Sequence, residues 1–100
     1  MTFKNGMRPV HPGEVLREDF LRPAHLSANA LAKALHVPAP RVNDIVRERR
    51  GITADTAMRL ARYFGGDAHS WMQLQAIYEL RLAETANART IEREVVPMAG

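Results

Sequence analysis

Basic and polar side chains gather between residues 39 and 50, and their types are those that contact nucleic acids. Arg41 can fork its guanidinium onto guanine O6 and N7, and Asn43 can pair with adenine N6 and N7. Asp44 only accepts hydrogen bonds, as from cytosine N4, or it forms an ion pair with Arg41 or Arg47 three residues away. This segment therefore carries side chains suited to reading base edges.

A second group of cations closes the same segment. Arg47, Arg49 and Arg50 suit DNA phosphates, because bound Lys and Arg side chains neutralise phosphates and release counterions. The alternative is a solvated helix end, where cations lie near the negative end of the helix dipole. Ala39 and Pro40, at the start of the segment, can touch a thymine methyl but offer no side-chain hydrogen bond.

No pattern in the sequence predicts an enzyme. The chain has no cysteine, which excludes disulfides, thiol nucleophiles and cysteine-based zinc sites, and it has no glycine-rich phosphate loop. The four histidines are scattered without metal-ligand spacing: His11, His25, His36 and His69. We therefore expect no catalytic residue, no metal site and no cofactor.

Helical periodicity places the basic segment on the second of two short helices. Ser27 is a natural N-cap for a helix from residue 28 to 35, and a second helix follows after the prolines at positions 38 and 40. Two short helices joined by a three- or four-residue turn form a helix-turn-helix, here over about residues 27–48. In this motif the second helix enters the major groove, which is about 12 Å wide.

The apolar residues of the second helix define which of its side chains face outward. Val42, Ile45 and Val46 form the inward stripe. With about 100° of rotation per residue, the opposite face is that of Pro40, Asp44 and Arg47, with Arg41 and Asn43 on its flanks. Those outward residues are the candidate contacts to DNA.

Three more predicted helices complete an all-α fold. The first runs over residues 13–21 and ends at Pro23, and another, capped by Thr53 with Asp55 in its first turn, ends at the glycines at 65 and 66. A last helix begins after Asp67 or Ser70 and ends between residues 83 and 87. The pattern predicts a compact five-helix domain.

The last helix is apolar along two lines. Its core line comprises Trp71, Leu74, Ile77, Tyr78 and Leu82. Its second line is a candidate dimer interface and comprises Met72, Ala76, Leu80 and Ala83. A helix that is apolar on two sides needs two partners, here the domain core and a second subunit, unless one small core buries both lines.

Size and charge agree with a single small DNA-binding domain. The chain has 100 residues, 46% of them hydrophobic, and a net charge of +3. Residues 1–50 carry a net charge of +4 and residues 51–100 a net charge of −1, so the basic character lies with the predicted helix-turn-helix. No apolar run is long enough to cross a bilayer and no signal peptide is evident, so we expect a cytoplasmic protein.

We expect three parts along the chain: an N-terminal arm over residues 1–10, the helix-turn-helix domain over 11–86, and a C-terminal tail over 87–100. The alternative for the tail is a short strand, built on Ile91, Val95 and Val96, that pairs across a dimer.

Three segments resemble the HigA (VapI-like) antitoxins of bacteria. They are His-Pro-Gly-Glu-Val-Leu-Arg-Glu-Asp-Phe-Leu at 11–21, Gly-Ile-Thr-Ala-Asp-Thr-Ala-Met-Arg-Leu-Ala-Arg-Tyr-Phe-Gly at 51–65 and Trp-Met-Gln-Leu-Gln-Ala-Ile-Tyr-Glu-Leu-Arg-Leu-Ala at 71–83. The resemblance covers about residues 7–86. It implies a dimeric repressor that binds a palindromic operator in double-stranded DNA of its own promoter and neutralises a HigB-type, mRNA-cleaving toxin.

The resemblance also implies roles for single residues. Ala39, Pro40, Arg41, Asn43 and Asp44 match positions that face bases, and Ser27, Ala28 and Arg47 match positions that meet phosphates. This sequence departs from the pattern in three places: His36 stands where glycine is common in the turn, Pro40 stands where a polar reader is common, and the arginines at 47, 49 and 50 replace a shorter basic motif.

Two alternatives remain open from the sequence. One is a solitary helix-turn-helix regulator with no toxin partner. The other is a toxin-binding module with weak or no DNA binding. The acidic residues Asp44 and Glu48 in the predicted DNA-binding segment favour this alternative. For the toxin surface we expect a contribution from the first helix together with the N-terminal arm.

Overall fold

The computed structural model describes residues 8–99, and that part of the chain is helical without any strand. A continuous first segment comprises α1 (Pro12–Val15), the π-helical η1 (Leu16–Leu21) and α2 (Arg22–Ala24), and it is followed by α3 (Ala28–Leu35), α4 (Ala39–Val46), α5 (Ala54–Phe64) and α6 (Ala68–Glu94). The predicted all-α fold with five helical segments is confirmed. The expected N-terminal arm lies outside the described residues except for positions 8–10.

The first helical segment runs through Pro23, so the predicted end before that proline is wrong. The backbone N–H of Arg22 donates to the carbonyl of Arg17, five residues earlier, in the wider π-helical turn. This turn places Pro23 at the start of the short α2, where a proline needs no intrahelical partner. The segment ends only at His25, whose φ of 54° is left-handed.

A glycine holds the first segment close to the helix-turn-helix. A Cβ atom at Gly13 would lie 1.8 Å from the carbonyl oxygen of Ile45, near the end of α4. Gly13 is therefore required by a backbone-to-backbone contact, whereas the sequence shows it only as a break at the start of a helix.

The core lies between the first segment, α3, α4, α5 and the start of α6. Leu31, Val42, Ile45 and Leu60 are almost fully buried, and Trp71 joins them from α6. The rings of Phe20 and Trp71 have centroids 5.1 Å apart, which extends this core to η1.

A buried amide ties α6 to the loop between α4 and α5. The side-chain oxygen of Gln75 accepts a hydrogen bond of 2.7 Å from the backbone N–H of Ile52, and its nitrogen donates to Glu79. Both the loop and the start of α6 are thereby fixed relative to the core. Ile77 and Leu82, which the sequence placed on the inward line, are instead 44% and 45% exposed, because the core reaches only the first turns of α6.

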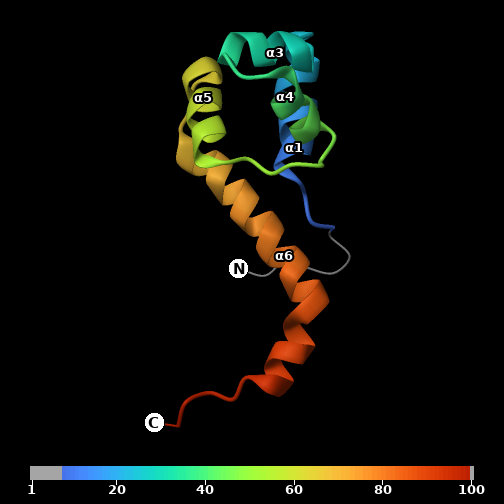
Figure 1. Ribbon diagram of the computed structural model, residues 1–100, viewed down its shortest axis with the longest axis vertical. Helices are drawn as coiled ribbons and strands as arrows, with labels where there is room; N and C mark the ends of the chain where they lie inside the picture. Colours follow the sequence, from blue (N-terminus) through green and yellow to red (C-terminus); the bar gives the residue numbers. More distant parts are fainter. Residues whose placement is uncertain (1–7, 100) are drawn as a thin grey trace.

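The last helix is longer than the sequence predicted. It continues to Glu94, so the predicted end between residues 83 and 87 is wrong, and residues 88–94 of the expected tail are helical. The segment after Ala83 contains no glycine or proline before Pro97, and most of its residues favour helix. In Figure 1, α6 runs away from the other helices and its second half lies beyond them.

Candidate nucleic-acid interface

The first helix of the helix-turn-helix begins with a capped, exposed N-terminus. The hydroxyl of Ser27 accepts a 3.0 Å hydrogen bond from the backbone N–H of Ala30, as predicted for an N-cap. Ser27 is exposed and Ala28 is half-buried. The free N–H groups of this turn, at the positive end of the helix dipole, are suited to a phosphate oxygen.

The turn between α3 and α4 is built on a left-handed residue. His36 has φ 59° and ψ 46°, and its N–H donates to Lys33 while that of Val37 donates to Ala32. These two hydrogen bonds form a Schellman motif, which usually has glycine at the left-handed position. His36 thus adopts a left-handed backbone at the turn position where glycine is common in the family.

The second helix turns its apolar side inward as predicted. Val42 and Ile45 are buried and Val46 is half-buried. Pro40 is exposed, and Arg41, Asn43 and Asp44 are half-buried because they contact neighbouring side chains at the rim of the helix. At the end of α4 the cations Arg47, Arg49 and Arg50 are all exposed.

Asn43 is engaged within the helix-turn-helix. Its side-chain nitrogen donates to the side-chain oxygen of Asn29 on α3 at 2.7 Å and to the carbonyl of Ala39 at 2.9 Å. An adenine contact by Asn43 would therefore replace or share the bond to Asn29. The pair also brings Asn29, a residue that the sequence analysis did not single out, onto the candidate interface.

Arg41 is held by a carboxylate of α5. Its Nη1 donates to Oδ2 of Asp55 at 2.9 Å, and Nε of Arg59 donates to the same oxygen at 2.8 Å. The hydrogen bond from Arg59, with that from Arg41, keeps the pKa of Asp55 below its ordinary value. Asp55 is therefore a carboxylate at neutral pH.

Asp44 pairs with different arginines from those expected. Its carboxylate lies 3.2 Å from Arg49 and 4.0 Å from Arg50, whereas the sequence analysis considered Arg41 and Arg47. The chain turns back after α4, since Glu48 adopts a left-handed φ of 63°, and this brings the later arginines to Asp44. Such exposed pairs are weak, so phosphates can compete for both arginines.

Glu48 is directed to the first helical segment. Its carboxylate lies 3.3 Å from Arg17, which also donates to the carbonyl of Val46. Arg17 therefore balances Glu48, and the negative charge of Glu48 is paired away from the arginines that follow it. The cationic character at the end of α4 rests on Arg47, Arg49 and Arg50.

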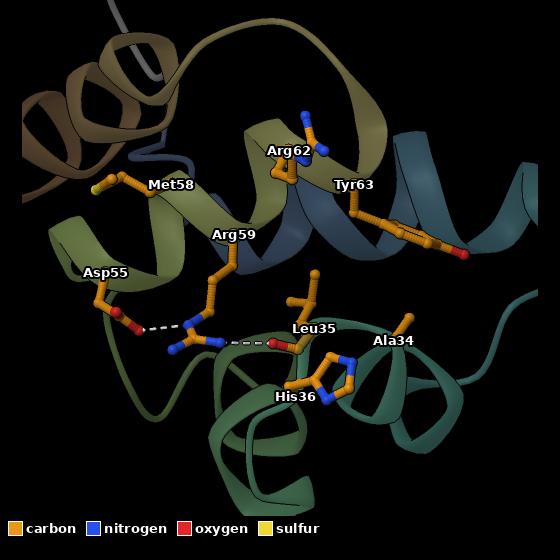
Figure 2. A pocket seen from close by; sticks show the side chains of 8 residues that line it. All are labelled: Ala34, Leu35, His36, Asp55, Met58, Arg59, Arg62 and Tyr63. Carbon is orange, nitrogen blue, oxygen red and sulfur yellow. Dashed lines mark hydrogen bonds and ion pairs between the residues drawn. The ribbon is translucent and has the colours of Figure 1, made fainter.

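Two shallow grooves flank this surface. One, of about 440 Å³, lies beside α4 and is lined by Arg41, Arg50, Gly51, Thr53, Asp55, Thr56 and Arg59. The other, of about 620 Å³, lies between the end of α3 and α5 and is lined by Ala34, Leu35, His36, Asp55, Met58, Arg59, Arg62 and Tyr63. In Figure 2 the Arg59 side chain crosses from α5 to the Leu35 carbonyl, so it forms a bridge between the two helices.

Asp55 and Arg59 are the residues that sequence reasoning missed. Asp55 was read only as a favourable charge in the first turn of a helix, and Arg59 was not singled out. Their spacing of four residues signals an i,i+4 ion pair, but nothing in the local sequence shows that Arg41 joins it.

The candidate dimer line on α6 is exposed. Met72 and Leu80 are 36% and 60% exposed, and Ala76 and Ala83 are exposed as well. Residues 8–99 contain no group of three or more His, Asp and Glu side chains placed to hold a metal ion. Within the same range, each helix is too short or too polar to span a bilayer.

Comparisons with known proteins point to one family. A helix-turn-helix family model (HTH_3) matches residues 16–70. Virulence-associated protein I of Dichelobacter nodosus is 65% identical over 81 residues, which cover 81% of this chain and 75% of the relative.

Two solved structures share the fold over nearly the whole chain. A structure described as Pseudomonas aeruginosa antitoxin HigA with higBA promoter has 55% identity and a TM-score of 0.89, and the match covers 92% of this chain and all of that one. Antitoxin GraA in complex with its operator has 44% identity and a TM-score of 0.89, and the match covers 99% of this chain and all of that one.

Proposed function

Since the chain belongs to the helix-turn-helix family and, within it, to the HigA (VapI-like) antitoxins, we propose that it is a DNA-binding transcriptional repressor and the antitoxin of a HigB-type, mRNA-cleaving toxin. It binds a palindromic operator in its own promoter as a homodimer, because two-fold symmetric half-sites call for two copies of the recognition helix. It acts without catalysis or a cofactor.

The arrangement of α4 carries this proposal. The helix buries Val42 and Ile45 and leaves Arg41 beside a groove, while three exposed arginines follow at its C-terminal end. In the groove of DNA, the N-terminal half of α4 faces base edges and the arginines after it reach the backbone. Ser27, the N-cap of α3, and Ala28, its first residue, meet a phosphate of the DNA backbone.

The residues we assign to DNA have distinct tasks. Arg41, Asn43 and Asp44 contact base edges, and Ala39 and Pro40 pack against the floor of the groove. Backbone contacts come from Ser27, Ala28, Arg47, Arg49 and Arg50.

A mobility-shift assay with the DNA upstream of the gene tests the repressor function. We expect a shift at low salt that weakens steeply as salt is added, and a footprint with two-fold symmetry. No shift at low salt, where phosphate contacts are strongest, contradicts DNA binding and leaves the alternative of a toxin-binding module.

Arg41→Ala tests base reading within the same assay. We expect a loss of about 1–3 kcal/mol in operator binding and a relaxed preference at one base pair of each half-site. A uniform loss on every DNA sequence would make Arg41 a phosphate contact instead.

Expression of the neighbouring gene tests whether the protein has a toxin partner. We expect a small basic protein encoded beside this gene to arrest growth when expressed alone and to co-purify with this chain when both are expressed. A neighbour that neither arrests growth nor binds contradicts the antitoxin role and leaves a solitary regulator, whose DNA binding the mobility shift measures separately.

A further inference from the structure

Asp55 stands outside the set of residues assigned to DNA, yet it contacts one of them. It occupies the first turn of α5, and its side chain is 57% exposed beside the groove along α4. A carboxylate at the edge of a DNA-binding surface repels phosphates, although its place in the first turn of α5 suits the helix dipole. Its hydrogen bonds point to a second role.

Asp55 is the middle of a chain of contacts that joins three helices. Arg59 donates through Nη1 to the carbonyl of Leu35, the last residue of α3, at 2.8 Å, and through Nε to Asp55 Oδ2 at 2.8 Å. The same oxygen accepts from Nη1 of Arg41 on α4 at 2.9 Å. The guanidinium of Arg41, on α4, is thus linked through Asp55 and Arg59 to the end of α3.

Anchoring Arg41 matters because a guanine contact is directional. A guanidinium recognises guanine with two parallel N–H groups in one plane, and a long free side chain must first be ordered to present them. The bond to Asp55 uses one of the five N–H groups of the guanidinium. Arg41 therefore keeps donors for a base while its position is set in advance.

We infer that Asp55 is a positioning residue that orients Arg41 for base recognition, through the Leu35–Arg59–Asp55–Arg41 chain. The inference rests on the proposed DNA-binding function. It assigns to a residue of α5 a part in the sequence preference of α4, although the carboxylate of Asp55 makes no contact with DNA itself.

The two effects of Asp55 on DNA binding have opposite signs, which makes the inference testable. Asp55→Asn removes a negative charge near the phosphates, so affinity for DNA of any sequence stays the same or rises. The amide no longer holds two cations, so Arg41 loses its fixed orientation and base discrimination falls. A merely structural loss would weaken both kinds of binding together.

The experiment compares the dimeric full-length protein with its variants on three kinds of duplex. They are the operator, operators in which each G·C pair of the half-sites is replaced in turn, and a scrambled duplex of the same length. The measured quantity is the ratio of the dissociation constant for each altered operator to that for the operator. We expect Asp55→Asn to lower this ratio by about fivefold at the one position that Arg41→Ala also relaxes, which is the low end of one base contact.

A double-mutant cycle and a rescue variant test whether Asp55 acts on base discrimination through Arg41. In an Arg41→Ala background, Asp55→Asn should change the ratio no further, because the two residues act as one unit. Asp55→Glu keeps the carboxylate and should recover part of the ratio. Arg59→Gln, which leaves Asp55 in place but removes its anchor, should lower the ratio at the same position.

Asp67→Asn is the matched control. It removes one aspartate charge at the N-cap of α6, where Asn is also a good cap, and it should leave the ratio unchanged. An unchanged or higher ratio for Asp55→Asn overturns the inference while the repressor function stands. A wild-type protein that binds operator and scrambled DNA equally overturns the repressor function and the inference together.

Discussion

The helix-turn-helix and the part of α6 after Gln75 differ in how their side chains are used. Around α3 and α4 the polar groups contact one another, as in the pairs of Asn43 with Asn29 and of Arg41 with Asp55. Along α6 the apolar residues Ile77 and Leu80 are exposed and have no core to cover them. In Figure 1 α3 and α4 lie next to α1 and α5 at one end of the molecule, and α6, after its first turns, extends away from these helices.

This difference shows which region is complete within one chain. A surface that contacts DNA needs side chains held in place, and the ion pairs and hydrogen bonds of the helix-turn-helix supply this within one copy. A helix with exposed leucine and isoleucine gains stability when a second surface buries them. We therefore expect substitutions in the first region to alter folding and DNA binding, and substitutions on α6 to alter assembly.

Leu80→Glu should have the largest effect, and it acts on assembly. Each copy of the interface loses about 2 kcal/mol of apolar burial, so a dimer loses about 4 kcal/mol. Light scattering should show monomers, and operator affinity should fall with the loss of two-site binding. Met58→Glu makes the same change at a residue of α5 that is 65% exposed, and it should leave the dimer intact. A dimer that persists in Leu80→Glu would remove this line from the interface.

Gly13→Ala should have the next largest effect, and it acts on the packing of the first region. The new methyl group would meet the backbone carbonyl of Ile45, which cannot move as a side chain can. We expect a loss of about 3 kcal/mol in the free energy of unfolding, measured in urea. Gly51→Ala, whose methyl would lie nearest to side-chain atoms of Gln75, should cost less, and an equal loss in both variants would contradict the backbone contact.

Replacing Arg49 and Arg50 together by alanine should weaken binding to all DNA by about 1 kcal/mol for each contact, because both face solvent. The slope of log affinity against log salt should become shallower by about 1.8, which corresponds to two phosphates. Arg89 and Arg93, exposed on the second half of α6, supply the matched double variant, which should keep the wild-type slope. Equal slopes in all three proteins would remove Arg49 and Arg50 from the interface.

Lowering the pH should destabilise the first region through His11. Its Nδ1 accepts a hydrogen bond from the N–H of Gly13, its ring packs on Tyr78, and burial lowers its pKa below 6.5. The nearby charges have smaller effects on that pKa: Glu48 raises it and Arg17 lowers it. The unfolded state therefore binds a proton first as the pH falls, and the contribution of His11 is complete above pH 6.5 and is lost below it.

The expected loss below pH 6.5 is at most about 1.4 kcal/mol for each pH unit, measured by urea unfolding at several pH values. His11→Asn keeps a capping oxygen without titrating and should flatten this dependence. An unchanged pH dependence in that variant would assign the effect to another group.

His36→Gly should have the smallest effect, and it should be stabilising. Glycine adopts the left-handed conformation of the α3–α4 turn without the strain of a side chain, so we expect a gain of about 1 kcal/mol and a higher melting temperature. Ala34→Gly, two residues earlier inside α3, should lose about 1 kcal/mol. A loss in His36→Gly would show that its imidazole makes a contact more valuable than the strain it carries.

The sequence by itself determined the parts of this protein that depend on near neighbours. The caps at Ser27 and Thr53 and the inward stripe of α4 follow from residues within four positions of one another. Helix propensity and amphipathic spacing act over that range, so the all-α fold and the helix-turn-helix could be predicted.

Only the tertiary structure decided which distant groups meet. The contacts of Gly13 with Ile45, of Gln75 with Ile52 and of Asp55 with Arg41 each join residues more than a dozen positions apart. Such pairs depend on the path of the whole backbone and on the angles between helices, which periodicity does not specify. For the same reason the reach of α6 beyond the core, and with it the exposure of Ile77 and Leu82, became evident only in three dimensions.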